Sequence, residues 1–390
     1  MRILHVYRTF FPDTQGGLEE VIRQICRGTE ANGVASRVFT TTKNKKTPKK
    51  ISLPGLDVIQ VTETFEIASC NVALTGFKEF KKQVKWADLI HYHFPWPFAD
   101  ALHLIFAKDK PTVMTYHSDI VRQKFLLMFY RPLMKRFLKS IDRVVCTSPN
   151  YFATSDVLSS VESKVEVIPI GLDADSYPEP EKEVLEKVEA EFGRDFFLFV
   201  GVLRYYKGLH ILLDAIKNAP YQVVIVGSGP IELELKRQAE SLDLDNVTFA
   251  GQVSDEIKVS LFRLSKSIVF PSYLRSEAFG VTLLEGAMFS KPLISTEVGS
   301  GTSHVNVHGE TGFVIAPGSA RALRRAMDQI HSRPEFAALM GVRAKKRFDK
   351  LFTGQLMANR YFHLYQRILG NESGEERDLG VHSAQRRVQL

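Results

Sequence analysis

Two carboxylates stand eight residues apart in the stretch from Ser276 to Gly299, which reads S-E-A-F-G-V-T-L-L-E-G-A-M-F-S-K-P-L-I-S-T-E-V-G. The small-residue turn Ala278-Phe279-Gly280 follows Glu277 and can open a helix that carries Glu285. A helix start offers free N–H groups and the positive end of the helix dipole to an anion. The stretch therefore predicts a site for a ligand with both hydroxyls and phosphate. An exposed glutamate followed by a solvated helical glutamate would give the same pattern, because charged helix starts are common.

Groups that suit a phosphate occur at two further places. Arg204 and Lys207 lie in G-V-L-R-Y-Y-K-G (residues 201–208), and a guanidinium fork with an ammonium is a natural partner for a diphosphate. Gly16 and Gly17 stand directly before an apolar-periodic stretch, where a phosphate can come close to backbone N–H groups. A solvent-exposed pair of cations and an ordinary tight turn are the plainer alternatives.

Histidines also follow predicted strands. His117 comes after one of them, and a histidine packed at a strand end is an equally good interpretation of it. His91 and His93 alternate along one strand, so their side chains face the same side. Together with Asp119 they suggest a metal, but the sequence contains no fixed ligand set, and we expect no metal site.

Length and composition indicate a soluble protein of two domains. The 390 residues suffice for two ordinary domains, and 44% hydrophobic with 24% charged residues is typical of globular proteins. No apolar run approaches the roughly 20 residues that span a bilayer. The opening M-R-I-L-H-V-Y-R-T-F is too short for a signal peptide and predicts a buried strand. Cys26, Cys70 and Cys146 lack metal-ligand spacing and suit a reducing cytoplasm.

The net charge of +7 is concentrated in the first half of the chain. Residues 1–170 hold 24 Lys and Arg against 16 Asp and Glu, whereas the remainder holds 27 against 28. This asymmetry predicts an anionic partner of the first half: a membrane surface, a phosphorylated substrate or a nucleic acid. Residues 122–143 have the pattern of a basic amphipathic surface helix, although a core helix with a cationic solvent face is the plainer interpretation.

Apolar runs alternate with amphipathic stretches, which predicts an α/β class with two parallel sheets. The predicted strands are 2–8, 35–42, 57–61, 88–93, 111–116, 143–148, 164–170, 196–200, 222–226, 247–250, 267–270, 292–298 and 312–315. The acidic, proline-containing stretch 171–183 breaks the alternation and predicts a domain boundary. The expected division is a first domain 1–175, a second domain 176–354, a helix 355–369 that joins the first domain, and a disordered tail 370–390.

The candidate residues share one position relative to the predicted strands. Ligands of open parallel sheets bind beyond the carboxyl ends of the strands. The candidates that come just after a predicted strand are Gly16, Gly17, His93, His117, Arg204, Lys207, Glu277 and the segment Gly299–Thr302. If the two sheets face each other, these residues converge on one cleft.

The sequence resembles the retaining nucleotide-sugar glycosyltransferases of the GT-B fold, the large family four, along nearly its whole length to about Leu369. The motifs that carry the resemblance are P-D-T-Q-G-G-L-E-E, H-Y-H-F-P-W-P-F-A-D, Y-H-S-D, G-V-L-R-Y-Y-K-G, S-E-A-F-G-V-T-L-L-E and G-S-G-T-S-H-V-N-V-H-G-E-T-G-F-V. More narrowly, the sequence looks like bacterial mannosyl- or rhamnosyltransferases that build lipopolysaccharide O-antigen or similar polysaccharides from GDP-sugars. The implied fold is two Rossmann-like domains whose parallel sheets face each other across a cleft.

The resemblance also implies a role for each candidate. Glu277 would hold the hydroxyls of the donor sugar, and Glu285 would bind the ribose of the nucleotide. Lys207 and an arginine would bind the diphosphate leaving group. The family places that arginine directly after the glycine of its G-R-L…K-G element, whereas this chain has Val202 there and Arg204 two residues later.

Further residues would complete the donor and acceptor sides. His117 would reach the donor sugar near the reacting carbon, and His93 would belong to the acceptor side. The remaining implied donor contacts are Gly16, Gly17, Phe279, Gly280 and Val281. Similar enzymes retain the anomeric configuration without an obvious protein nucleophile, so the departing phosphate would take the acceptor proton. No metal or other cofactor is expected.

The expected activity is therefore sugar transfer from a GDP-sugar to a lipid-linked saccharide at the anionic inner face of the cytoplasmic membrane. A UDP-sugar-dependent transferase and a nucleotide-sugar epimerase of the same architecture are the alternatives from enzyme chemistry. A nucleic-acid-binding protein is suggested by charge alone. Because no recognisable binding module accompanies that charge, no nucleic-acid partner is expected.

Overall fold

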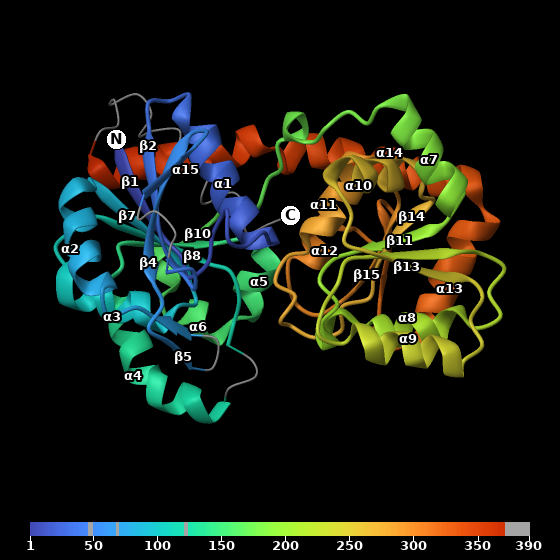
Figure 1. Cartoon of the computed structure of the whole chain (residues 1–390), viewed down its shortest axis with the longest axis horizontal. Helices are drawn as coiled ribbons and strands as arrows, with labels where there is room; N and C mark the ends of the chain where they lie inside the picture. Colours follow the sequence, from blue (N-terminus) through green and yellow to red (C-terminus); the bar gives the residue numbers. More distant parts are fainter. Residues whose placement is uncertain (46–49, 68–69, 121–123, 371–390) are drawn as a thin grey trace.

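The computed structural model describes residues 1–45, 50–67, 70–120 and 124–370. The tail expected beyond Gly370, and Arg122 of the expected basic helix, lie outside these ranges. Two lobes stand side by side, each built on its own twisted sheet with helices on both faces (Figure 1). The α/β class with two Rossmann-like sheets is therefore confirmed.

The first lobe is built on an eight-stranded sheet in the order β10-β9-β8-β7-β1-β2-β4-β3. Its strands are β1 (Arg2–Val6), β2 (Ala35–Thr42), β3 (Lys50–Leu53), β4 (Leu56–Thr62), β7 (Leu89–Phe94), β8 (Thr112–Tyr116), β9 (Arg143–Cys146) and β10 (Val165–Val167). Central strands such as β7 and β8 are buried at every position, because helices cover both faces of a parallel sheet. The helices are α1 (Gly17–Glu30), α2 (Gly76–Trp86), α3 (Pro97–Phe106), α4 (Lys124–Ser140), α5 (Pro149–Thr154) and α6 (Asp156–Ser159).

The first sheet departs from the expected all-parallel arrangement at one edge. β3 pairs antiparallel with β4, and it begins at Lys50, between the predicted strands 35–42 and 57–61, where no strand was predicted. Lysines suit such an edge strand, since they discourage pairing with another chain. A separate antiparallel hairpin, β5 (Phe65–Ile67) with β6 (Cys70–Val72), was also not predicted.

The expected basic helix is shorter than its charge pattern predicted. α4 ends at Ser140 because the chain must turn before β9 begins at Arg143. The Lys164 ammonium donates to the carbonyl oxygens of Lys139 and Ile141 at 2.7 and 2.6 Å, and so satisfies carbonyls at this helix end.

The second lobe is built on a six-stranded sheet, parallel throughout, in the order β13-β12-β11-β14-β15-β16. Its strands are β11 (Phe197–Val200), β12 (Val223–Val226), β13 (Val247–Gly251), β14 (Ser267–Phe270), β15 (Leu293–Thr296) and β16 (Gly312–Ile315). Its helices are α7 (Lys182–Phe192), α8 (Leu209–Ile216), α9 (Glu232–Ser241), α10 (Asp255–Leu264), α11 (Val281–Met288), α12 (Thr302–Val305), α13 (Ala320–Ser332) and α14 (Pro334–Leu351). Serine side chains cap α10 and α13 by accepting a hydrogen bond from a backbone N–H in the first turn of the helix. Each cap fixes the residue at which its helix begins.

The chain passes between the lobes twice, and the two passes lie side by side. The N–H of Leu172 donates to Phe352 O at 2.9 Å, and the N–H of Gly354 donates back to Leu172 O at 2.7 Å. The second pass leads into α15 (Gly354–Leu369), which returns to the first lobe (Figure 1). There Tyr361 and Tyr365 bond Thr115 and His91 of the first sheet at 2.9 and 2.8 Å. The final helix therefore belongs to the packing of the first lobe.

Candidate active site

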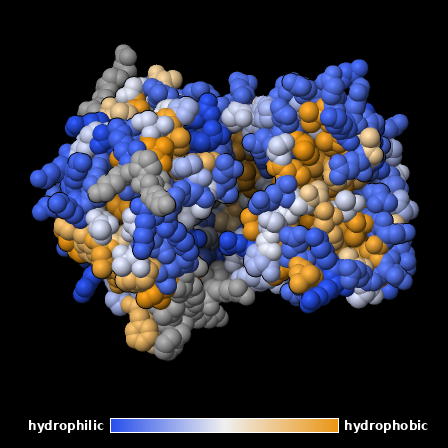
Figure 2. Space-filling view, viewed as in Figure 1, coloured by the Kyte–Doolittle hydropathy of each residue, from blue (hydrophilic) through white to orange (hydrophobic). Residues whose placement is uncertain are grey.

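A cavity of about 2240 Å³ separates the two lobes, and Figure 2 shows the molecule hollowed between them. Its walls come from the carboxyl ends of both sheets: Arg8 follows β1, His117 follows β8, Gly201 follows β11 and Gly227 follows β12. Drug-sized ligands occupy roughly 300–1,000 Å³. The cavity thus has room for two substrates at once.

Two helix N-termini meet inside this cavity. Gly16 precedes α1 and Gly280 precedes α11, and neither helix start is capped by a side chain. A Cβ built on Gly17 would lie 3.5 Å from the Val281 side chain, so the two helix starts approach each other closely across the cleft. Gly280 has a φ of +91°, a conformation that favours glycine and lets the chain turn directly into α11. Two positive dipole ends facing each other favour an anion between them.

Lys207 lies in the wall that the second lobe contributes to the cavity. Its ammonium contacts Glu277 Oε2 at 2.6 Å, and the two side chains are only 12% and 10% exposed. The same ammonium lies 4.6 Å from the centre of the Phe270 ring, a cation–π contact with the last residue of β14. Ser272 Oγ donates to the same Glu277 oxygen at 3.2 Å. Glu277 and Lys207 therefore form one buried charged unit that opens onto the cavity.

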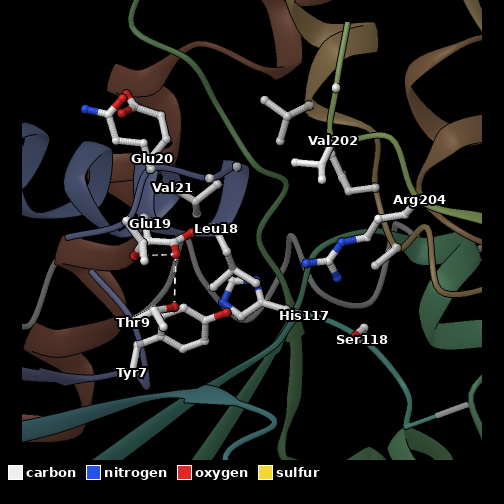
Figure 3. Close-up of a pocket in the computed structure, with 18 of the residues that line it drawn as sticks. Tyr7, Thr9, Leu18, Glu19, Glu20, Val21, His117, Ser118, Val202 and Arg204 are labelled. Atoms are coloured by element: carbon white, nitrogen blue, oxygen red, sulfur yellow. Dashed lines mark hydrogen bonds between the residues drawn. The ribbon is translucent and has the colours of Figure 1, made fainter. Parts of the chain in front are cut away.

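Arg204 supplies the second cation. It precedes the 3₁₀ turn Tyr205–Lys207, and its guanidinium extends from the second lobe toward His117 of the first (Figure 3). Val202, which stands where the family has arginine, is 46% exposed and also lines the cavity. The 3₁₀ turn thus brings Arg204, two residues after the position at which the family has arginine, into the space between the lobes.

Glu285 lies one helical turn inside α11 and is buried. Its Oε1 accepts from Tyr177 Oη at 3.0 Å and lies 3.4 Å from Lys258 Nζ. Burial raises the pKa of Glu285, against the influence of Lys258 and Tyr177. For Lys258, burial lowers the pKa, but Glu285 and Asp255 outweigh it, so that the net direction is up. Glu285 is therefore a buried hydrogen-bond acceptor in the wall of the cavity, and the alternative of a solvated glutamate is wrong.

His117 closes the first-lobe side of the cavity. Its Nε2 lies 3.0 Å from His93 Nδ1, and its side chain is 5% exposed. Burial lowers the pKa of His117 to about 3, so the ring is neutral at physiological pH.

His93 does not line the cavity, contrary to its expected place on the acceptor side. It is 1% exposed and lies behind His117, in contact with His5 and His91. The reason is that His91 and His93 both face the side of the sheet that α15 covers, as the hydrogen bond from His91 to Tyr365 shows. The segment Gly299–Thr302 was expected in the same cleft but does not line the cavity either, and its Ser300 and Thr302 are fully buried. The candidates that do line the cavity are Gly16, Gly17, His117, Arg204, Lys207, Glu277, Phe279, Gly280, Val281 and Glu285.

Several cavity residues carry no signal that spacing alone reveals. Glu19 is 8% exposed and accepts from Thr9 and Thr14 hydroxyls at 2.9 and 3.0 Å, the first of which is drawn in Figure 3. Across the lobes, Arg275 Nε donates to Asp119 Oδ2 at 2.8 Å; within the second lobe, its Nη1 donates to Gly299 O at 2.7 Å. The Asp119–Arg275 pair is a direct tie between the lobes at the rim of the cavity.

Within the described residues, one group of side chains has metal-ligand geometry. Nitrogens of His5, His91 and His93 lie within 4.8 Å of one another, and all three rings are buried. Both nitrogens of His91 already have hydrogen-bond partners, in Tyr365 and Thr115. In the same part of the chain, no helix has the length and hydropathy to cross a bilayer.

The comparisons with known proteins agree with this architecture. Residues 15–176 match the family described as Glycosyltransferase Family 4, and residues 181–347 match the family described as Glycosyl transferases group 1. Sucrose-phosphate synthase from Thermosynechococcus elongatus has the same fold, with a TM-score of 0.79 over 95% of this chain and 100% of its own, at 22% identity. WaaG, a glycosyltransferase involved in lipopolysaccharide biosynthesis, superimposes with a TM-score of 0.68 over 93% of this chain and 99% of its own, at 17% identity.

Two relatives are much more similar in sequence. D-rhamnosyltransferase WbpZ of Pseudomonas aeruginosa is 50% identical over 90% of this chain and 92% of its own length. O-antigen chain mannosyltransferase C of Escherichia coli is 46% identical over 96% of this chain and 100% of its own. The chain therefore belongs to the family-four glycosyltransferases of the GT-B fold and is an enzyme of that class.

Proposed function

We propose that this enzyme moves mannose or rhamnose, with retention of configuration, from a GDP-sugar to a lipid-linked saccharide in the synthesis of O-antigen or a similar polysaccharide. The observation that carries the proposal is the convergence of two uncapped helix starts with Arg204 and Lys207 in one cavity. That arrangement suits a diphosphate, whose negative charge grows as the sugar leaves. The names of the rhamnosyltransferase and mannosyltransferase relatives support the sugar and the pathway.

The donor would lie along α11. The diphosphate would lie between the starts of α1 and α11, the sugar hydroxyls would bond Glu277, and the ribose would bond Glu285. Each carboxylate already has a cation beside it, Lys207 for Glu277 and Lys258 for Glu285. Carboxylates held in this way suit hydrogen bonds to hydroxyls, whereas an acid/base pair would need both beside the scissile bond.

The leaving phosphate would itself take the proton of the acceptor hydroxyl, on the face from which it departs. Arg204, Lys207 and the helix starts would stabilise the charge that develops there. These fixed cations would stabilise the leaving diphosphate without a divalent ion, so the reaction as proposed needs no metal. Contacts from both lobes imply that the productive complex is the closed one.

The acceptor would enter at the first lobe. Ile67 and Phe129 line the cavity and are 59% and 66% exposed, which suits the lipid portion of an acceptor. α4 adds exposed Arg131, Lys135, Arg136 and Lys139 on its outer side. Apolar and cationic side chains together suit an anionic membrane surface, so we place the enzyme peripherally on the inner face of the cytoplasmic membrane.

A donor panel tests the proposal. Purified protein would be mixed with extracted membrane lipid and, in separate reactions, GDP-mannose, GDP-rhamnose, UDP-glucose and UDP-N-acetylglucosamine, with products identified by mass and by the anomeric configuration from NMR. We expect transfer from a GDP-sugar with retention. Transfer from a UDP-sugar alone would replace the donor, inversion would refute the mechanism, and donor turnover without acceptor would favour an epimerase. No turnover of any donor by folded protein would refute the proposal.

A further inference from the structure

Three histidines form a hydrogen-bonded chain that runs from the interior of the first lobe to the cavity. His5 Nδ1 lies 3.1 Å from His93 Nε2, and His93 Nδ1 lies 3.0 Å from His117 Nε2. Successive rings are stacked, with interplanar angles of 19° and 21°. His5 and His93 are 0% and 1% exposed, so only His117 reaches the cavity wall.

The three rings are neutral. Burial lowers the pKa of His5 to about 3 and of His117 to about 3, and it lowers the pKa of His93 well below its ordinary value. A neutral imidazole has one N–H donor and one bare nitrogen that accepts. Both hydrogen bonds of the chain must therefore point the same way, either toward the cavity or away from it.

The inner end of the chain decides the direction. His5 Nε2 is buried and has no hydrogen-bond partner within the described residues. If the bonds pointed away from the cavity, this nitrogen would carry a proton with no acceptor. If they point toward the cavity, only a lone pair is left without a donor. Buried N–H groups without acceptors are rarer in proteins than acceptors without donors, so the second direction is favoured.

We propose that His5 and His93 are positioning residues that hold His117 in the tautomer protonated at Nδ1, so that it presents an N–H donor to an oxygen of the ligand in the cavity. The inference about the ligand rests on the proposed function, in which that oxygen belongs to the nucleotide-sugar. The tautomer itself follows from the chain of rings alone.

This assignment restricts what His117 can do. Its Nδ1 already carries the proton, so it cannot remove one from the acceptor hydroxyl. The chain of rings ends at a buried nitrogen, so no proton can be supplied from the interior when Nδ1–H is lost. His117 is then a fixed neutral donor, and His93 acts on the reaction only through it. Stacking of the rings also keeps the His117 ring from rotating.

Nitrogen NMR tests the tautomer directly. Protein labelled with ¹⁵N in its histidine rings would be studied without ligand, and His117 would be assigned by comparison with His117→Gln. We expect a protonated Nδ1 and a bare Nε2 for His117. A bare Nδ1 would overturn the proposal. Stoichiometric zinc or another transition metal in the purified protein would also overturn it, because His5 and His93 would then be ligands.

Variants at position 93 test the positioning role. Glutamine can still donate to His117 Nε2, whereas leucine of similar size cannot. We expect His93→Leu to lower kcat for transfer from the donor that the panel identifies by about tenfold, the value of one hydrogen bond, with KM little changed, and we expect His93→Gln to recover most of it. His103→Gln is the matched control. His103 is also buried and hydrogen-bonded, to Tyr92 and Ser140, but it does not belong to the row of hydrogen-bonded histidines.

The outcomes separate the two proposals. Equal kcat for His93→Leu, His93→Gln and the parent would overturn the positioning role. If the parent has the expected tautomer but both variants lose kcat equally, the positioning role is overturned as well. If His93→Leu does not fold, His93→Gln and the NMR of the parent protein still decide the matter. No turnover by the parent protein would refute the proposed function, while the NMR result would stand or fall separately.

Discussion

Replacing Lys207 with alanine separates the role of the Lys207–Glu277 unit in catalysis from its role in stability. The change removes the ammonium from beside the Glu277 side chain, which is 10% exposed in the parent protein, and leaves Ser272 Oγ at 3.2 Å as its remaining side-chain donor. The Phe270 ring also loses the ammonium that lies 4.6 Å from its centre.

The two effects differ in size. Breaking a fully buried ion pair costs about 3–5 kcal/mol, but here both side chains open onto a wide cavity from which water can reach the carboxylate. We therefore expect a loss of about 1–3 kcal/mol in the free energy of unfolding, which corresponds to about 2–4 °C in melting temperature per kcal/mol for a domain of this size. Loss of a fixed charge at a leaving group lowers kcat by about 10²–10³-fold. The protein should remain folded while most activity disappears, and Glu277→Ala should behave in the same way.

The assay pairs a thermal melt with initial rates of sugar transfer at saturating donor. Lys236→Ala is the matched control, because Lys236 forms an exposed pair with Glu232 at 2.8 Å on the outer face of α9, and its removal should cost at most about 1 kcal/mol and leave the rate unchanged. Near-normal kcat in both Lys207→Ala and Glu277→Ala would mean that the reaction does not occur at this part of the cavity. A rate loss that merely follows the unfolded fraction would refute the electrostatic reasoning.

Three further expectations follow from the geometry. Arg275→Ala removes the hydrogen bonds to Asp119 and Thr154 across the lobes, so the ligand-free protein should show a larger radius of gyration in X-ray scattering and a higher KM for the donor; unchanged values of both would contradict the tie. Glu285→Gln replaces the charged acceptor beside Lys258, and calorimetry should show GDP binding weakened by about 10–100-fold, whereas equal affinity would place the ribose elsewhere. Burial raises the pKa of Asp100 to about 8, despite its hydrogen bond from Tyr130. Because the folded state then holds a proton that the unfolded state releases near pH 4, the contribution of Asp100 to stability falls as pH rises from about 4 to 8; urea melts should show that slope flattened in Asp100→Asn, and an unchanged slope would refute the assignment.

Periodicity sufficed for the elements that position the donor side. The turn at Ala278-Phe279-Gly280 opens α11 where the residue types predicted, and Glu285 lies on that helix. Apolar runs located the central strands because parallel strands are buried on both faces. Edge strands lack that signal, which is why β3, with its alternation of exposed and half-buried positions, was missed.

Pairings between distant residues could not be predicted from the chain alone. Arg275 and Asp119 are 156 residues apart, and Tyr177 and Glu285 are 108 apart, so no local spacing connects them. The position of His93 was misjudged for a related reason. Because His93 comes at the end of a strand, we expected its side chain in the cavity. Whether that face of the sheet is open depends on where α15 packs, and α15 lies more than 250 residues later in the chain.

The return of α15 to the first lobe also affects the order in which the protein can fold during synthesis. Domains generally fold in turn, with the N-terminal one first. Here the first sheet cannot bury the face that carries His91 and Thr115 until Tyr361 and Tyr365 have left the ribosome, by which time the second lobe is complete. The lobe that begins the chain is therefore the last to be finished. Until then, the face of the first sheet that α15 will cover stays exposed to chaperones. A fragment that ends where the chain first passes to the second lobe would lack α15 altogether.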